Sequence, residues 1–401
     1  MRKYILLIIL TLLVVTCFKS KKQQNPVYET IYPIKTSMFA VIDDKSAGKD
    51  SRFLLANPFY TLISDSGHIL IGDENHIKIF NNKGENYKIL GNRGQGPNEY
   101  MYPFFIYVYP NGTINTYEPE SNYYSIYNKK YQFVNKKKFE KSNNLNAYLE
   151  QKGIDKDAVF SVFSFLAIDE KRIVYWIALE ERKINKYYWL LAYEDENKFI
   201  PIYWGKNDRI VITKTGRYSS TTLGYILLTG ITEDEICYYV SSEDKYIDDN
   251  IGQYFFHIYS LKTEKDTLIT NFCEPKKFSK ESILNSSISK RTGELDKDIK
   301  KFYEQKKYFP LLLNIFPVNS TYIFNCMWQT KNKNRIFHIY DIKTKKYLCT
   351  AGWDQNLVYP MRIAKSLYPF PTKNEKGYQI VQIYSVDLSF LDKIQLEKAG
   401  K

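Results

Sequence analysis

The chain has 401 residues, and its 57 basic and 44 acidic side chains give a formal net charge of +13. The basic residues are scattered rather than clustered, in a chain rich in lysine, asparagine, isoleucine and tyrosine, so the charge does not indicate a nucleic-acid partner. The length suffices for one large β domain or two smaller domains.

The N-terminal segment has the pattern of a secretory signal. Arg2 and Lys3 precede an apolar run from Tyr4 to Val15. That run is shorter than the about 20 residues that a membrane-spanning helix needs. A basic start and a short apolar run are typical of a signal peptide. No later segment is long and apolar enough to cross a bilayer, so we expect the rest of the chain to be soluble and tethered.

A cysteine directly follows the apolar run. The sequence VVTC, which ends at Cys17, resembles the lipobox of bacterial lipoproteins, although Val14 is usually Leu and Thr16 is usually Gly, Ala or Ser. The resemblance implies that residues 1–16 form a signal peptide, that Cys17 is lipidated, and that 17–26 form a tether. A plain signal peptide cut nearby is the alternative.

Strand-forming residues dominate the remainder, with 36 tyrosines and 24 phenylalanines, and polar turns break short apolar runs as in all-β proteins. The segment NPFYTLISDSGHILIGDENHIKIF, from Asn57, is similar to YPFFIYVYPNGTINTYEPESNYYSIY, which starts at Tyr102, about 45 residues later. The matched pairs include Pro58 with Pro103, Phe59 with Phe104, Gly67 with Gly112 and Ile69 with Ile114. The chain therefore contains an internal repeat.

One aromatic residue in a strand-like run anchors each repeat. The six anchors are Phe80, Tyr127, Tyr193, Tyr259, Tyr340 and Tyr384. A unit of three or four short strands cannot bury both of its faces alone, whereas six such units stacked in a ring can. We therefore expect an all-β fold, a six-bladed β-propeller with short helical insertions.

Two long gaps between anchors predict helical insertions on one rim, at about 142–152 and at 278–309. The final unit is short of a strand, and residues 27–43 precede the first unit. We expect this segment to pair with the last unit around 377–386, because that would close the ring and remove exposed strand edges. Residues 27–401 are thus expected to form one propeller domain.

The loop ILGNRGQGPNEY, residues 89–100, joins the first two repeats. It lacks the Lys-Ser or Lys-Thr of a phosphate-binding P-loop and the third glycine of a dinucleotide-binding turn. We interpret it as a structural connection between blades. Its structural positions are Gly91, Gly94, Gly96 and Pro97. Arg93, Asn98 and Glu99 are the candidate ligand-facing residues of this loop.

The same loop, followed by a proline and the next repeat, resembles the connection in NHL-type propellers. It is especially similar to a family of six-bladed, TolB-like propeller lipoproteins of Gram-negative bacteria, most closely over residues 55–140. The resemblance implies a six-bladed propeller on a lipid anchor in the cell envelope. Relatives sent to the cell surface often carry an acidic tract after the lipidated cysteine. Lys19, Lys21 and Lys22 stand there instead, which favours a periplasm-facing anchor over surface exposure.

Motifs for catalysis are absent from the sequence. None of the four histidines has an H-E-x-x-H spacing, and no G-x-S-x-G elbow is present. His257 and His338 occupy the same place in adjacent repeats, which we interpret as a shared half-exposed strand position. The carboxylates near repeat turns are Asp73, Glu118, Asp169, Glu233 and Asp234. We predict no catalytic residue, metal ligand or cofactor.

The leading function is therefore a non-catalytic binding or scaffold module for a peptide, glycan or protein partner, attached to a membrane through its N-terminal lipid. The alternative is a metal-dependent hydrolase or lyase of the NHL-like type, since such enzymes hold a metal with histidines and carboxylates at the channel mouth. Whether the chain is an enzyme stays open, with the non-catalytic interpretation favoured.

The four remaining cysteines are predicted to be free thiols. Cys237 and Cys326 fall in the second strand of the fourth and fifth units, and Cys273 and Cys349 fall in the fourth strand. Alternate strands of a sheet lie about 9–10 Å apart. A disulfide needs Cα atoms within about 7 Å. The five tryptophans fall in or beside predicted strands and are expected to pack in the core.

Overall fold

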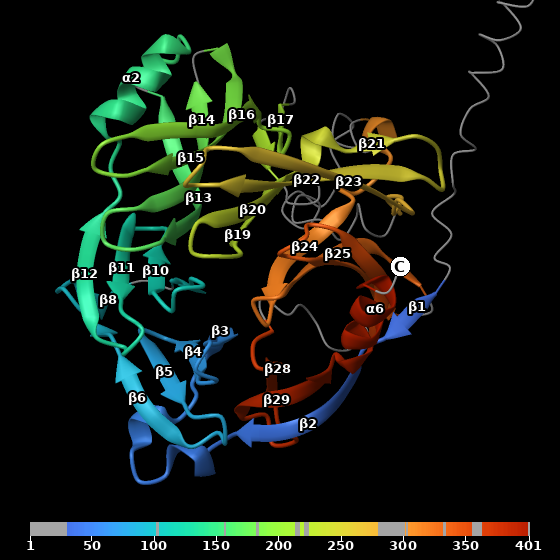
Figure 1. Ribbon diagram of the computed structural model, residues 1–401. Coiled ribbons are helices and arrows are strands. Elements are labelled where there is room, and N and C mark those ends of the chain that lie inside the picture. The colour runs from blue at the N-terminus through green and yellow to red at the C-terminus, as the bar shows by residue number, and fades with distance from the viewer. Residues whose placement is uncertain are drawn as a thin grey trace, which may run out of the picture.

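The computed structural model shows six sheets arranged in a ring, like the blades of a propeller (Figure 1). The structure describes residues 30–101, 104–155, 158–181, 184–212, 217–219, 224–279, 301, 304–331, 334–354 and 363–399. The expected all-β, six-bladed β-propeller is confirmed. Cys17 and the segments expected to form a signal peptide and a tether, 1–16 and 17–26, lie outside the described residues.

The first three blades are four-stranded antiparallel sheets whose strands follow chain order from the centre outward. Blade 1 contains β3 (Pro58–Ile63), β4 (Ile69–Asp73), β5 (His76–Phe80) and β6 (Asn86–Leu90). Blade 2 contains β9 (Phe105–Val108), β10 (Ile114–Glu118), β11 (Tyr123–Tyr127) and β12 (Phe133–Lys138). Blade 3 contains β13 (Val159–Ala167), β14 (Ile173–Glu181), β15 (Lys186–Glu194) and β16 (Phe199–Lys206).

Blades 4 and 5 each carry one additional strand. Blade 4 contains β19 (Ile226–Gly230), β20 (Glu235–Val240), β22 (Gly252–Ser260) and β23 (Asp266–Cys273), with the short β21 (Lys245–Tyr246) beside β22. Blade 5 contains β24 (Leu312–Val318), β25 (Tyr322–Lys331), β26 (Asn334–Asp341) and β27 (Tyr347–Asp354), with β1 (Ile31–Pro33) added in parallel to β27.

Blade 6 joins the two ends of the chain, as expected. It contains β28 (Leu367–Lys373), β29 (Gln379–Asp387) and, as its outer strand, β2 (Lys35–Ile42). Lys35 lies opposite Asp387 and Ile42 lies opposite Val381, so the predicted pairing is confirmed. The pairing of β1 with blade 5 was not predicted, and it divides the N-terminal segment between two blades (Figure 1).

The aromatic anchors occupy a repeated structural position with one exception. Five of them lie on the third strand from the centre of their blade. Tyr384 lies on β29, the second strand of blade 6, because that blade takes its outer strand from the N-terminal segment. The sixth repeat therefore differs from the others by one strand position.

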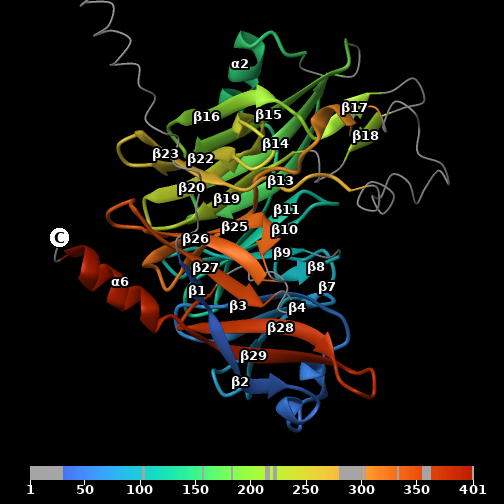
Figure 2. The ribbon, with the colours of Figure 1, turned by 90° about the vertical axis from the view of Figure 1, so that its right-hand side faces the viewer.

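Two helices with both bounds in the described part of the chain lie outside the blades. The predicted helix is present as α2 (Asn143–Gln151), where the Ser142 side chain accepts a hydrogen bond from Leu145 N at 3.0 Å and caps the first turn. The C-terminal helix α6 (Ser389–Ala399) was not predicted; it buries Leu391 beside β27 and projects from one side of the ring (Figure 2). Most of the predicted helical insertion at 278–309 lies outside the described residues.

Short elements lie in the connections between blades and, in one case, between two strands of blade 4. They are the parallel pair β7 (Asn92–Arg93) and β8 (Glu99–Tyr100), the hairpin β17 (Ile210–Ile212) and β18 (Arg217–Ser219), and the 3-10 helices η1 (Lys45–Ala47), η2 (Ser51–Phe53) and η4 (Ser241–Glu243). Within the described part of the chain, no helix is both long enough and apolar enough to cross a membrane.

The core lies between neighbouring blades, where apolar faces of adjacent sheets meet. Trp176, Trp189 and Trp353 are buried there as expected, and Trp204 and Trp328 are half-buried. The cysteines occupy the predicted second and fourth strands and are buried, free thiols. These positions are consistent with cysteine acting as a small apolar side chain.

Candidate functional site in the central channel

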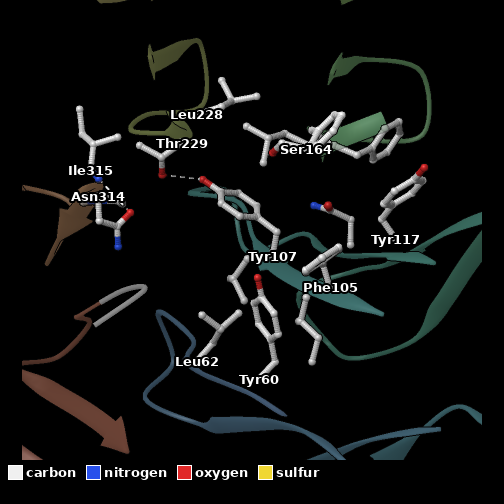
Figure 3. A pocket seen from close by; sticks show the side chains of 17 residues that line it. Tyr60, Leu62, Phe105, Tyr107, Tyr117, Ser164, Leu228, Thr229, Asn314 and Ile315 are labelled. Carbon is white, nitrogen blue, oxygen red and sulfur yellow. Dashed lines mark hydrogen bonds between the residues drawn. The ribbon is translucent and has the colours of Figure 1, made fainter. Parts of the chain in front are cut away.

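A cavity of about 210 Å³ lies in the channel at the centre of the ring (Figure 3). The inner strands β3, β9, β13, β19 and β24 line it, together with β10. Six of its 17 lining residues are aromatic: Tyr60, Phe105, Tyr107, Tyr117, Phe163 and Phe165. The channel therefore offers rings from three consecutive blades to anything that enters it.

Tyr60 and Phe105 form an aromatic pair that lines the channel. They occupy equivalent positions in the first two repeats, directly after the matched Phe59 and Phe104. Their rings meet edge to face, with centroids 5.6 Å apart, and Phe105 is 46% exposed. This arrangement joins two neighbouring blades and leaves aromatic surface open. The repeat alignment was the signal that could have revealed this pair from the sequence.

The hydroxyl of Tyr107 forms hydrogen bonds between two strands of the channel wall. It lies 3.0 Å from the hydroxyl of Thr229 and accepts a hydrogen bond from Gly230 N on β19, across the channel from β9 (Figure 3). The bonds link blades 2 and 4. Tyr107 therefore supports the shape of the cavity rather than offering a free polar group.

The hydroxyl of Tyr60 is different, because it has no hydrogen-bond partner among the described residues. Its side chain points into the channel (Figure 3). Burial raises the pKa of Tyr60 to about 12, so the hydroxyl stays protonated at neutral pH. It can both donate and accept a hydrogen bond, and it is a ready contact for a polar atom of a ligand.

The remaining polar side chains of the channel are uncharged. Asn115 is 1% exposed and donates through Nδ2 to Ala167 O at 3.2 Å. Asn314 accepts a hydrogen bond from Ile315 N through Oδ1 at 2.9 Å. No Asp, Glu, Lys, Arg or His is among the described residues that line the cavity. The channel chemistry is thus neutral, aromatic and amide-bearing.

Two of the carboxylates that the sequence singled out serve the fold. Asp73 accepts hydrogen bonds from Ala56 N at 3.0 Å and Asn57 N at 2.5 Å, and it pairs with Lys78 at 2.5 Å. Glu118 accepts from Met101 N and lies 3.3 Å from Nζ of Lys136. Each carboxylate sits at the end of its blade's second strand and holds the segment that precedes the inner strand.

The other three carboxylates are at or near the surface. Asp169 pairs with Arg172 at 2.7 Å, and Asp234 lies 3.5 Å from the same guanidinium. Glu233 is exposed. Within the described residues, no three side chains of His, Cys, Asp or Glu converge in a way that would hold a metal ion.

The two matched histidines have opposite surroundings. His257 lies between Asp266 at 2.7 Å and Glu243 at 2.8 Å. Burial opposes its protonation, but these two hydrogen bonds outweigh it and raise the pKa of His257 to about 9. His338 is buried beside the Tyr254 hydroxyl at 2.8 Å, and burial lowers its pKa to about 3. Neither histidine lines the channel.

The connection at 89–100 folds back on itself. Glu99 accepts a hydrogen bond from Gly96 N at 2.7 Å, and Asn98 accepts one from the Tyr127 hydroxyl at 2.7 Å. At Gly94, φ is +153°, a backbone conformation that residues with a Cβ rarely adopt, so this position favours glycine. Arg93 is exposed. The ligand-facing role of Arg93, Asn98 and Glu99 stays a prediction.

No family model and no curated protein matches the chain. Solved structures with a similar arrangement include virginiamycin B lyase from Staphylococcus aureus, at 9% identity over 87% of this chain and 99% of that chain, with a TM-score of 0.35. Oligogalacturonate lyase in complex with manganese matches at 8% identity over 90% of this chain and 99% of that chain, with a TM-score of 0.39.

A protein of unknown function from Bacteroides caccae matches at 10% identity over 73% of this chain and 80% of that chain, with a TM-score of 0.31. At such identities and TM-scores the similarities carry no inference about activity. The class that the sheets and the channel define is a six-bladed β-propeller with a neutral, aromatic central cavity.

Proposed function

We propose that this protein is a non-catalytic binding propeller that receives part of a peptide, glycan or protein partner in its central channel. The observation that carries the proposal is the neutral, aromatic cavity, in which the Tyr60 hydroxyl has no hydrogen-bond partner among the described residues. Its volume of about 210 Å³ is smaller than the roughly 300–1,000 Å³ of pockets that enclose a whole small-molecule ligand. One ring or side chain therefore enters, and the rest of the ligand lies over the mouth.

The binding proposal is tested on peptide and glycan arrays with the mature protein. We expect a defined ligand class to bind the wild type, to lose about tenfold or more in affinity with Phe105→Ala, and to keep its affinity with Tyr378→Ala. Tyr378 is 67% exposed and outside the channel, so it is a matched control for losing an aromatic side chain. Ligands that bind both variants equally would contradict the proposal.

The proposed location is the periplasmic side of an envelope membrane, through a lipid on Cys17, as in the NHL- and TolB-like lipoproteins that the sequence resembles. The support is the N-terminal pattern and the loop at 89–100. Cys17→Ala is expected to move the protein into the soluble periplasmic fraction. A variant that stays with membranes, together with a wild type that carries no acyl mass at its N-terminus, would refute this anchor.

The alternative function is a metal-dependent hydrolase or lyase, and it predicts a different response to a chelator. Within the described part of the chain, Asp73 and Glu118 are engaged by lysines and backbone amides, and no metal-competent cluster forms. We expect a chelator to leave the melting temperature of the protein unchanged. We also expect a ligand incubated with the protein to keep its mass, because it is not cleaved. A fall in melting temperature with chelator, restored by a divalent metal, would favour the enzyme.

A further inference from the structure

The cation Arg209 lies beside the channel, and no counter-ion for it is found among the described residues. Its guanidinium lies over the ring of Phe163, 4.9 Å from the centroid, and Phe163 lines the cavity. Among the described residues, the Arg209 side chain forms no ion pair and no hydrogen bond. The adjacent Asp208 is turned elsewhere, because its carboxylate accepts hydrogen bonds from Ser241 Oγ at 2.9 Å and Trp189 Nε1 at 3.4 Å.

Three buried hydrogen-bond donors at or near Arg209 have no partner among the described residues. Asn207 is 2% exposed; its Oδ1 accepts from Arg209 N at 3.0 Å, and its Nδ2 is buried without a partner among the described residues. Nε of Arg209 and Nε1 of Trp176 are also buried without a partner among the described residues. The ring of Trp176 lies 5.2 Å from that of Phe163. Native proteins leave few buried polar groups unpaired, so these three donors, two of them on residues that contact the ring of Phe163, need an explanation.

The charge itself is poorly compensated. Burial lowers the pKa of Arg209, because a partly desolvated cation without a partner is unfavourable. The connection at 207–224 contains three basic residues and one acidic residue, Asp208. The two terminal nitrogens of Arg209 are less buried than Nε, since only Nε is both unpaired and fully covered. They are the atoms that an incoming anion can reach.

We propose that Arg209 binds the C-terminal carboxylate of a peptide or protein whose last, apolar side chain enters the channel. The inference rests on the proposed channel function and names its ligand. One guanidinium matches the single charge and the planar fork of a carboxylate. An apolar side chain suits the cavity better than a sugar ring, whose several hydroxyls would find few free polar groups there.

The test uses N-acetyl-L-phenylalanine and its amide, which differ only in the charged group. The readout is the indole N–H signals of the ¹⁵N-labelled mature protein, with Trp176 and Trp189 assigned through Trp→Phe variants. We expect the acid to shift the Trp176 signal and the amide to bind at least about tenfold more weakly. D-glucuronate and inorganic phosphate, as an acidic sugar and a divalent anion, are expected to bind more weakly than the acid.

The matched variants are Arg209→Gln and Lys206→Gln, which each remove one positive charge; Lys206 is exposed, on β16, three residues away. Arg209→Gln is expected to reduce the affinity for the acid to that for the amide, and Lys206→Gln to change neither. The inference would be overturned if the acid did not bind, if the acid and the amide bound equally, or if glucuronate or phosphate bound more tightly than the acid. It would also be overturned if Arg209→Gln left the affinity for the acid unchanged. Acid binding that is unaffected by Phe105→Ala would contradict both the channel function and this inference, whereas acid binding that falls with Phe105→Ala but not with Arg209→Gln would contradict this inference alone.

Discussion

At the scale of single residues, Tyr107 and Tyr60 are a natural comparison, because both line the channel but only Tyr107 uses its hydroxyl within the described part of the protein. Tyr107→Phe removes the contacts with Thr229 and Gly230 and leaves a buried backbone N–H unpaired. We expect it to destabilise the fold by about 1–3 kcal/mol. Tyr60→Phe removes a hydroxyl with no partner there and should cost less than about 0.5 kcal/mol. Thermal or chemical unfolding of both variants measures the difference; equal losses would contradict the assigned hydrogen bonds.

His257 and His338 differ in the direction in which they couple stability to pH. The folded-state pKa of His257, about 9, is above its unfolded value of about 6.5. Its contribution is therefore complete below pH 6.5 and is lost as pH rises to 9. The folded-state pKa of His338, about 3, is below the unfolded value, so its contribution is complete above pH 6.5 and is lost as pH falls toward 3.

The wild type is expected to lose free energy of unfolding as pH rises from 6.5 to 9, and we predict that His257→Gln reduces this loss by about 1–2 kcal/mol. The effect is limited to this size because Glu243 and Asp266 are partly exposed and therefore screened by solvent. His338→Gln should leave that alkaline range unchanged and serves as the control. Melting temperatures across pH measure the effect, and a histidine NMR titration checks the assignment. A His257 midpoint at or below 6.5 would contradict the double hydrogen bond.

The sequence revealed these residues unequally. Aligning the first two repeats places Tyr60 opposite Phe105, so a shared role is visible before the fold is known. The FHIY pattern equally places His257 and His338 at one repeat position, and both do lie on the third strand of their blades, but both are buried, so the predicted half-exposure is wrong. Their difference comes from residues of other strands and blades, such as Glu243 and Tyr254, which no local pattern specifies.

At the scale of elements, the closure of blade 6 is the most consequential feature. Deleting β2 exposes one edge of β29 and uncovers apolar side chains such as Val381 and Ile383, which are 0% exposed. A chain that starts at Asp44 is therefore expected to aggregate or to melt at a much lower temperature. A chain that starts at Glu29, which keeps β1 and β2, is the control and should melt like the mature protein.

A chain starting at Asp44 that melts like wild type would rule out this closure as a source of stability. An intermediate truncation that starts at Lys35 lacks only β1, which adds three residues to the edge of blade 5. We expect it to behave much closer to the control, since β2 and its seven paired positions with β29 remain.

Elements were predictable where local sequence decides them. Ser142 and the spacing of Leu145 and Leu149 specify α2 through a cap and a buried face. By contrast, α6 buries Leu391 and Ile394 against a blade that is distant in sequence, and β1 pairs in parallel with β27. Such contacts depend on how the ring closes, so neither was visible in the repeat pattern.

At the scale of the whole molecule, charged and uncharged side chains occupy different parts of the ring. The outside carries most of the charge of a chain with a net +13, whereas the cavity at the centre is lined by uncharged side chains. The number of blades was predictable, because six anchors recur along the chain. The lining of the channel was not, because it depends on which side chains of five inner strands turn toward one another once the blades are assembled.

The central claim is that the channel holds part of a partner. It is tested most directly by placing a photoreactive phenylalanine analogue at position 105 of the full chain in cells and irradiating. The account predicts a discrete adduct, whose mass identifies the partner, and no such adduct from the same analogue at position 378. Identical adducts from both positions, or none from position 105, would contradict the claim.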